Sequence, residues 1–496
     1  MNLKSSITSF LVFTLIIGFP VKIHAQNAFP RIEPEQKALD YYRLGAQSGY
    51  SWTELAEISL WASGDANLSA MNKLKVIVLN LNSAVKPEFS EKEKAEFILN
   101  YMHKNILKTY YIFQTKLDTL ISNGRYNCVS SAVFYIILCK SAGLNASGVM
   151  TKDHAFAMVH INGQNFDVET TNPYGFDPGN RKEFHDSSGK TTGFAYVPPQ
   201  NYRDRQTISQ IELVSLILNN RVGDFERANN FSSCVPLAVD RAALLLGNTY
   251  SKTAEVSASD FLFSDPRKDL MDRLLNYGAS LLRSGKEEEG INWAVYASSV
   301  YRDNNRWQEF LLAAVNNRIS RYVKDKRIQD ARNFLESQKS FIPEADYSQF
   351  DTLIIDAEIL NKANNFKTPD DGNGVVAAID QARTSGRLPE KRASELLTYT
   401  IQKIAASLCA APGKDWRAAI RYLENALYKY GPNRELEQAL RTYKANLIAD
   451  YHNRFAAEWN KKNYAEAERI LNEGLAEFPG DKQLLSDKQT IAKQKR

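Results

Sequence analysis

Apolar residues along the chain follow two different periods. From Ile32 to Leu120 they recur at mostly helical intervals, whereas from Gly148 to Val197 they alternate with small or polar residues. The dipeptide Asn162-Gly163 interrupts this alternation and is typical of a tight hairpin turn. After Pro198-Pro199 the apolar spacing is helical again to the end of the chain. The pattern therefore predicts one β-rich region within a mainly helical protein.

A small residue recurs along the helical second half of the chain. In the clearest unit, Tyr451 to Asp481, the residues Tyr464, Ala467 and Leu471 have the offsets of the second helix of a tetratricopeptide hairpin. The positions that correspond to Ala467 are Gly290, Ala331, Ala378 and Ala419. Their spacing is wider than the usual repeat of about 34 residues. The region therefore resembles a tetratricopeptide-type solenoid with lengthened helices, and an irregular helical bundle is the alternative.

Composition narrows the classes of protein to which this chain can belong. It has 496 residues, of which 44% are hydrophobic and 24% are charged, so it can bury packed cores and is not globally disordered. Lysine and arginine number 62 against 57 aspartates and glutamates, which gives a net charge of +5. A chain this close to neutral has no basic excess for binding nucleic acid. We therefore expect no nucleic-acid partner.

The start of the chain has the features of an export signal. Lys4 precedes an apolar run from Ile7 to Val21, and a small residue, Ala25, follows at the expected cleavage position. The run is shorter than the roughly 20 residues that a membrane span needs, and no later stretch approaches that length without charges. The sequence therefore predicts an exported protein, periplasmic or secreted, with no membrane span beyond this signal. The alternative is attachment to the membrane through an uncleaved N-terminal signal-anchor.

One of the four cysteines, Cys128, lies where a helix is expected to begin. Gly124 precedes it, an apolar helical run follows it, and Gly143 ends that run. At a helix N-terminus the macrodipole and the free backbone amides stabilise a thiolate, which is the nucleophilic form of cysteine. Cys139 lies inside the apolar run of the same helix, so we expect it to be a buried core residue. Four cysteines are too few for a disulfide-stabilised scaffold.

A histidine and two carboxylates follow this cysteine in the β-rich region. His154 is predicted to begin a strand, and Asp167 and Glu169 lie on the strand that returns after the hairpin turn. In such an arrangement the histidine can deprotonate the cysteine while a carboxylate orients the histidine. Residue type favours Asp167, because a shorter side chain is stiffer. The hairpin register favours Glu169, which returns to the start of the first strand, and we therefore expect Glu169 to contact His154.

Together these motifs resemble the transglutaminase-like superfamily, which has a papain-like cysteine fold. The matching residues are Asn127-Cys128, His154-Ala155-Phe156, Gly163 and Glu169-Thr170-Thr171. The resemblance implies an α+β papain-like, transglutaminase-like domain followed by an all-α tetratricopeptide-like solenoid. It also implies thiol acyl transfer, with Cys128 as the nucleophile and His154 as base and then acid. Glu169 or Asp167 would be the orienting carboxylate.

Further residues are candidates for the oxyanion donor and for the substrate groove. Gln114 lies upstream of the cysteine, as in papain-like enzymes, Tyr126 is a similar candidate, and the backbone amide of Cys128 is a third. The segment after the hairpin is rich in glycine, proline and aromatic residues, and Tyr174 and Phe176 are candidates for a wall of the groove. In the alternative, this loop only packs its own aromatic residues. We expect no metal and no cofactor, because the sequence lacks zinc-ligand spacing and phosphate- or dinucleotide-binding motifs.

The sequence predicts five segments. They are a signal peptide over 1–25, an N-terminal helical part of the catalytic domain over 26–110, a Cys-His-acid core over 111–205, a helical connector over 206–265 and helical repeats over 266–496. The predicted function is that of an exported cysteine-dependent amide hydrolase or acyltransferase with a protein or peptide substrate and a protein partner on the repeats. The alternative is a catalytically inert transglutaminase-like fold that serves as a tetratricopeptide-type adaptor between proteins.

Overall fold

The computed structural model describes residues 29–64, 68–187, 204–252, 265–302, 304–410 and 415–494. The predicted signal peptide, residues 1–25, lies outside these ranges. Contacts between residues divide the chain into two units, Met1–Phe310 and Leu311–Arg496. The division falls within helix α12 (Asn304–Lys324), whereas the sequence predicts that the repeats begin at residue 266.

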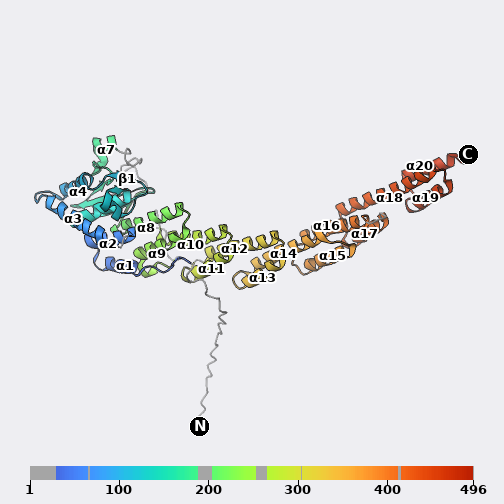
Figure 1. The fold of residues 1–496 in the computed structure, drawn as a ribbon, viewed down its shortest axis with the longest axis horizontal. Helices are drawn as coiled ribbons and strands as arrows, with labels where there is room; N and C mark the ends of the chain where they lie inside the picture. Colours follow the sequence, from blue (N-terminus) through green and yellow to red (C-terminus); the bar gives the residue numbers. More distant parts are fainter. Residues whose placement is uncertain are drawn as a thin grey trace, which may run out of the picture. The chain divides into compact units, whose positions relative to one another are not determined.

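A small antiparallel sheet lies inside the first unit, whose chain is drawn in blue to green-yellow in Figure 1. Its strands, in spatial order, are β5 (Gln164–Val168), β4 (Ala155–Ile161), β3 (Asn145–Met150) and β6 (Gln206–Ile208). Asn162 and Gly163 join β4 to β5 with positive φ angles of 49° and 78°, as a two-residue hairpin turn of this hand requires. The predicted hairpin is therefore confirmed. Strands β1 (Thr109–Tyr110) and β2 (Arg125–Tyr126) form a separate parallel pair.

Helix α6 (Cys128–Ser141) is the centre of the core of the first unit. All of its residues from Val129 to Cys139 are buried. The helix packs against β3 and β4, whose core-facing side chains alternate along the strand. Because a helix that is apolar on all sides must be covered all round, further helices pack on it. These are α2 (Trp52–Ser63), α4 (Glu91–Asn105), α5 (Leu117–Asn123) and α8 (Gln210–Arg227). This packing fixes the direction of α6 and the place of its first residue.

The remaining helices complete the first unit. They are α1 (Gln36–Ser48), α3 (Leu68–Ala84), α7 (Lys182–Ser187), α9 (Phe231–Leu246), α10 (Pro266–Arg283) and α11 (Glu287–Val300). Arg31 forms a two-point ion pair with Asp240 of α9, with N–O distances of 3.0 and 2.7 Å. The Tyr301 hydroxyl, just after α11, donates to the carbonyl of Ile32 at 2.5 Å. These bonds tie residues 31 and 32 to α9 and to the end of α11.

The sequence predicts an α+β papain-like, transglutaminase-like domain, and this part of the predicted fold class is wrong. An α+β domain has a sheet as one of its main layers, but the described residues contain six strands of two to seven residues, and the rest of their regular structure is helical. The alternating pattern from Gly148 to Val197 contributes to β3 and produces β4 and β5. After Val168 the described chain continues in turns, a 3-10 turn and α7. Alternation reports which face of a strand is buried, and it does not determine how many strands a sheet contains. The first unit is thus a helical unit that carries a small sheet.

The second unit is a helical solenoid. Its helices after α12 are α13 (Ile328–Gln338), α14 (Glu344–Asn365), α15 (Pro369–Thr384), α16 (Glu390–Leu408), α17 (Trp416–Tyr430), α18 (Arg434–Asn460), α19 (Tyr464–Glu477) and α20 (Lys482–Gln494). From α13 on, each helix packs on the next, and α14, α16 and α18 also contact the helix two positions further along. Figure 1 shows these helices in sequence order from α13 to α20.

The recurring small residues occupy helix contacts in most of these repeats. Ala331, Ala419 and Ala467 are fully buried, as expected for residues at a helix crossing. Ala378 is only partly buried, and Gly372 makes the close contact in α15. A Cβ atom added at Gly372 would lie 2.5 Å from Cγ1 of Ile404. The small-residue position has therefore shifted within α15, which the spacing alone did not indicate.

Candidate functional site

Cys128 is the first residue of α6, and the residue before it fixes its position. Asn127 caps the helix, because its Oδ1 accepts from the Ser130 amide at 2.9 Å and its own amide donates to the Ser130 hydroxyl at 2.9 Å. Nδ2 of Asn127 also donates to the carbonyl of Ile112 at 3.1 Å. As the first helical residue, Cys128 has an amide with no intrahelical acceptor. This amide lies at the positive end of the helix dipole.

The β4–β5 hairpin brings His154 and Glu169 together. His154 directly precedes β4 and Glu169 directly follows β5, so both lie at the open end of the hairpin. Nε2 of His154 is 2.6 Å from Oε2 of Glu169. The other carboxylate oxygen accepts hydrogen bonds from the hydroxyl and the amide of Thr171, at 2.6 and 3.2 Å. The hairpin register predicts this contact between His154 and Glu169, and the structure contains it.

Burial and charge act in opposite directions on this pair. Only 10% of the His154 side chain and 7% of the Glu169 side chain are exposed. Burial by itself lowers the pKa of His154, but the charge of Glu169 and hydrogen bonds to Cys128 and Glu169 raise it well above its usual value. Burial likewise raises the pKa of Glu169, but the charge of His154 and the hydrogen bonds from His154 and Thr171 lower it. The pair is therefore an imidazolium–carboxylate ion pair at neutral pH.

Cys128 and His154 line the same groove, and Cys128 contributes to the raised pKa of His154. Nε2 of His154 faces Glu169, so Nδ1, which is buried, is the ring nitrogen on the opposite side of the imidazole. Thiol, imidazole and carboxylate thus follow one another in the order of a nucleophile, a base and an orienting acid.

Asp167, the other candidate acid, forms an ion pair with Arg205. Nη1 of Arg205 donates to Oδ2 of Asp167 at 2.7 Å, and Nη2 contacts Oδ1. Asp167 lies opposite Met158 in the β4–β5 ladder, further along β4 than His154. Both side chains are largely buried, and the Arg205 guanidinium lies 5.3 Å from the centre of the Phe156 ring. The pair therefore links β5 to the residues that lead into β6.

Thr170 connects the segment of Glu169 to two helices. Its hydroxyl is 2.8 Å from the Ser131 hydroxyl of α6, and its carbonyl is 3.1 Å from Nε2 of His103 on α4. Burial lowers the pKa of His103 to about 4, so the ring is neutral at neutral pH and donates its Nε2–H to Thr170. The His103 ring also packs edge-on against Tyr126. Nothing in the sequence distinguishes His103 from a surface histidine, so this supporting contact was missed.

A groove of about 380 Å³ lies beside Cys128 and His154. Helix α8 contributes Leu216, Asn219, Asn220, Gly223, Asp224 and Arg227 to its lining. Ile112, Phe113 and the segment 150–155 line it as well, together with Arg273 of α10. A substrate in this groove would therefore contact both the thiol and one face of α8.

The two predicted oxyanion side chains do not line this groove. Gln114 donates from Nε2 to the carbonyls of Lys116 and Arg125, at 2.9 and 2.8 Å, so both of its amide hydrogens are used. Tyr126 is buried, and burial together with the charge of Glu169 raises its pKa to about 12. Of the three candidates, the backbone amide of Cys128 is the one that belongs to a groove-lining residue.

The two predicted groove aromatics also lie elsewhere. Phe176 is fully buried in the core, and its ring stacks on Phe166 with 6.1 Å between the centroids. Tyr174 is about half exposed, and its amide bonds to the side chain of Asn172 at 2.9 Å. The groove lining includes neither residue. Phe176 thus follows the alternative in which the loop packs its own aromatic residues.

The wall formed by α8 is a second part of the site that the sequence did not predict. The residues from Ile211 to Leu218 form a mostly apolar helical run that predicts only a core helix. Asn219 and Asn220 then interrupt the run, and Gly223 follows within the same helix. This polar interruption and the interior glycine are the signals that could have indicated a solvent-facing functional surface.

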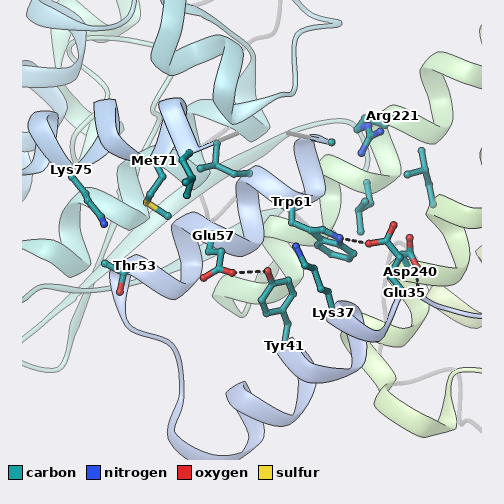
Figure 2. Close-up of a pocket in the computed structure, with 15 residues that line it drawn as sticks. Glu35, Lys37, Tyr41, Thr53, Glu57, Trp61, Met71, Lys75, Arg221 and Asp240 are labelled. Atoms are coloured by element: carbon teal, nitrogen blue, oxygen red, sulfur yellow. Dashed lines mark hydrogen bonds between the residues drawn. The ribbon is translucent and has the colours of Figure 1, made fainter. Parts of the chain in front are cut away.

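A second cavity, of about 650 Å³, lies among α1, α2, α3, α8 and α9 (Figure 2). Figure 2 shows the Tyr41 hydroxyl directed at Glu57 and the Trp61 ring directed at Glu35; the hydrogen bonds are 3.1 and 2.7 Å long. The described residues that line this cavity include no cysteine, serine or histidine. The groove beside Cys128 is therefore the better candidate for chemistry.

Two properties of the described ranges bear on metals and membranes. They contain no group of three or more His, Cys, Asp and Glu side chains that could hold a metal ion. None of their helices combines the length and the hydropathy that a bilayer crossing needs.

Comparison with known proteins assigns this chain to no family. No protein-family model matches it, and no curated protein does either. Among solved structures, it is similar to menin, in a crystal structure that reveals the binding site for the Mixed Lineage Leukemia (MLL) protein. The two chains are 12% identical, the match covers 84% of this chain and 94% of menin, and the TM-score is 0.31.

Proposed function

We propose that this chain is a cysteine-dependent amide hydrolase or acyltransferase that acts on protein or peptide substrates. The observation that carries the proposal is the ion pair of His154 with Glu169 in the groove that Cys128, the first residue of helix α6, also lines. An imidazolium beside a thiol at a helix N-terminus favours the thiolate, and a fixed carboxylate orients the imidazole. The resemblance of these motifs to the transglutaminase-like superfamily supports the same chemistry.

In the first step of the proposed reaction, the sulfur of Cys128 attacks the carbonyl carbon of an amide. The carbonyl oxygen becomes negative, and the backbone amide of Cys128 can donate a hydrogen bond to it. When this intermediate collapses, the carbon–nitrogen bond breaks and the imidazolium of His154 gives its proton to the leaving amine. An acyl thioester on Cys128 remains.

In the second step, water or a primary amine attacks the thioester. The attacking molecule gives a proton to His154, and the sulfur of Cys128 leaves as a thiolate. Water yields hydrolysis, whereas an amine yields acyl transfer or cross-linking, and both products come from the same thioester.

Export and a protein partner are further parts of the proposal. The signal pattern at the start of the chain supports delivery to a periplasm or to the outside of the cell, with an uncleaved signal-anchor as the alternative. The solenoid of the second unit is the support for a protein partner, because stacked helix pairs present an extended surface to which a protein can bind.

The proposal is tested by incubating the full chain with dimethylated casein and a fluorescent primary amine. Ammonia release reports attack on a side-chain amide, fluorescence in casein reports that an amine resolved the thioester, and new amino termini report peptide cleavage. At least one of these products is expected. Its rate should fall about 100-fold or more in Cys128→Ala and His154→Gln.

The matched control is Cys409→Ala, which removes a partly buried cysteine at the end of α16 in the second unit. This variant should keep the wild-type rate. If none of the three products forms and iodoacetamide labels Cys128 no faster than Cys409, the proposal is wrong and the inert adaptor is favoured.

A further inference from the structure

Gly223 lies in the interior of α8, where glycine is unfavourable. A glycine there loses more backbone freedom on folding than an alanine would. Close packing explains other interior glycines, such as Gly278 of α10, where an added Cβ would lie 2.7 Å from Cζ of Phe310. At Gly223 an added Cβ would meet only Nη1 of Arg227, at an ordinary contact distance of 3.5 Å. Packing within the protein therefore does not account for this glycine.

The space that Gly223 leaves open belongs to the groove beside Cys128. Gly223 lines this groove of about 380 Å³ together with Cys128 and His154. Because an added Cβ would have open space on its other sides, a larger side chain at this position would occupy part of the groove. The glycine thus enlarges the groove at the cost of a weaker helix.

The groove lining near this space combines aromatic and apolar side chains with a guanidinium group. Arg227 links it to Phe113, because the guanidinium carbon lies 4.3 Å from the centre of the Phe113 ring. Phe113 and Ile112 are 48% and 47% exposed, so these large apolar side chains are available to a ligand in the groove that they line. The charge of Arg227 is paired with Asp224. At this point the groove therefore offers apolar surface and a planar guanidinium face.

We propose that the space beside Gly223 is a subsite for a large apolar side chain, preferably an aromatic one, on the residue next to the amide that Cys128 attacks. An aromatic ring there would lie against Phe113 and Ile112 and would stack on the guanidinium of Arg227. The inference rests on the proposed function and adds the substrate class to it: peptides with a bulky apolar residue at the reacting carbonyl.

The test uses two peptidyl chloromethyl ketones that differ only in the residue next to the ketone, which is phenylalanine in one and alanine in the other. The thiolate of Cys128 displaces chloride from each reagent, and mass spectrometry of the full chain measures the rate. The phenylalanine reagent should react about tenfold faster or more, as expected when a subsite buries an aromatic side chain. Gly223→Leu should reduce this preference to less than about threefold.

The matched control is Gly374→Leu. Gly374 is also an interior helix glycine, in α15, and an added Cβ there would meet nothing within 4 Å. This variant should keep the tenfold preference. Gly223→Ala is the second variant, because alanine favours the helix and the protein should melt at or above the wild-type temperature. Its preference for the phenylalanine reagent should fall between those of the wild type and Gly223→Leu.

The outcomes separate this inference from the proposed function. If none of the three casein products forms and iodoacetamide labels Cys128 no faster than Cys409, the proposed function fails and the subsite fails with it. If Cys128 is labelled selectively but the two ketones react equally fast, the subsite is wrong and the nucleophile stands. A preference that survives in the folded Gly223→Ala and Gly223→Leu proteins also overturns the subsite, because the space would then lie elsewhere.

Discussion

Oε2 of Glu169 lies 2.6 Å from Nε2 of His154, while Oε1 of the same carboxylate accepts hydrogen bonds from Thr171. The carboxylate is thus anchored at both oxygens, once by the imidazole and once by the chain that follows β5. A rotation that released His154 would also break the bonds to Thr171. The direction of the imidazole is therefore set by a two-point anchor.

Replacing Glu169 with glutamine should test this anchor. Glu169→Gln keeps the shape of the side chain but removes the charge that holds the pKa of His154 well above its usual value. With less imidazolium beside the thiol, iodoacetamide labelling of Cys128 at pH 7 should slow about tenfold or more. The free energy of unfolding should fall by about 3 kcal/mol, because a buried ion pair loses one charge. Labelling kinetics and urea unfolding measure the two effects.

Asp167→Asn is the control for that variant. It removes a carboxylate two residues away, and this carboxylate is paired with Arg205. The loss of one partner from this largely buried pair should cost about 3 kcal/mol of stability, while labelling of Cys128 should change less than about threefold. If Asp167→Asn slows labelling and Glu169→Gln does not, the assignment of the orienting acid is reversed.

The four cysteines should react with iodoacetamide in a defined order. Cys128 is partly exposed and shares its groove with His154, so it should be labelled first. Burial raises the pKa of Cys139 to about 12 and that of Cys234 to about 11, and burial also raises the pKa of Cys409. In the folded protein at pH 7.5, Cys128 should react at least about tenfold faster than the others. Peptide mass spectrometry gives the four rates, and equal rates would contradict the order.

Local features of the site could be predicted from the sequence because each depends on neighbouring residues. The Asn-Gly turn fixes the β4–β5 register, and that register brings Glu169 to His154. The start of α6 at Cys128 follows from the Asn127 cap and the apolar run behind it. These relationships span no more than about one hairpin or one helix, so the local pattern contains the information that sets them.

The features that were missed or wrong depend on contacts between distant segments. Helix α8 lines the groove although it begins more than eighty residues after Cys128, and periodicity shows only that such a helix has a buried face. Phe176 was expected in the groove, but its ring packs against Phe166 and is buried in the core. The fold class failed for the same reason, because an alternating pattern does not state what covers a strand or how many strands join it.

The free energy of unfolding should fall as the pH decreases from 6.5 towards 4, because buried His103 takes up a proton less readily than it does in the unfolded chain. Its pKa is 6.5 without the fold and about 4 within it, so the unfolded chain binds this proton first as the pH falls. Neutral His103 therefore contributes its full share to the free energy of unfolding above pH 6.5. This contribution, up to about 3 kcal/mol, is lost as the pH falls towards 4. His103→Gln keeps a donor for the Thr170 carbonyl and should flatten this dependence. Urea unfolding between pH 4 and 7 measures it.

His185→Gln provides the comparison for His103→Gln. His185 is exposed on α7, so its replacement should leave the pH dependence of unfolding as in the wild type. The same slope in His103→Gln and in the wild type would contradict the role of His103.

The second unit should fold alone when the chain begins at α12, whereas a start near Asp265 should add a poorly packed helix. In the whole protein α10 buries Leu270, Met271 and Leu274, and this helix packs on α9. A chain of residues 265–496 lacks α9 and would expose this apolar face, so it should bind a hydrophobic dye or self-associate. A chain of residues 304–496 should be monomeric and helical and should melt cooperatively. Circular dichroism, dye binding and gel filtration compare the two chains.

If residues 265–496 are monomeric and bind no dye while residues 304–496 do not fold, the repeats begin before α12 and the start predicted at residue 266 is the better one.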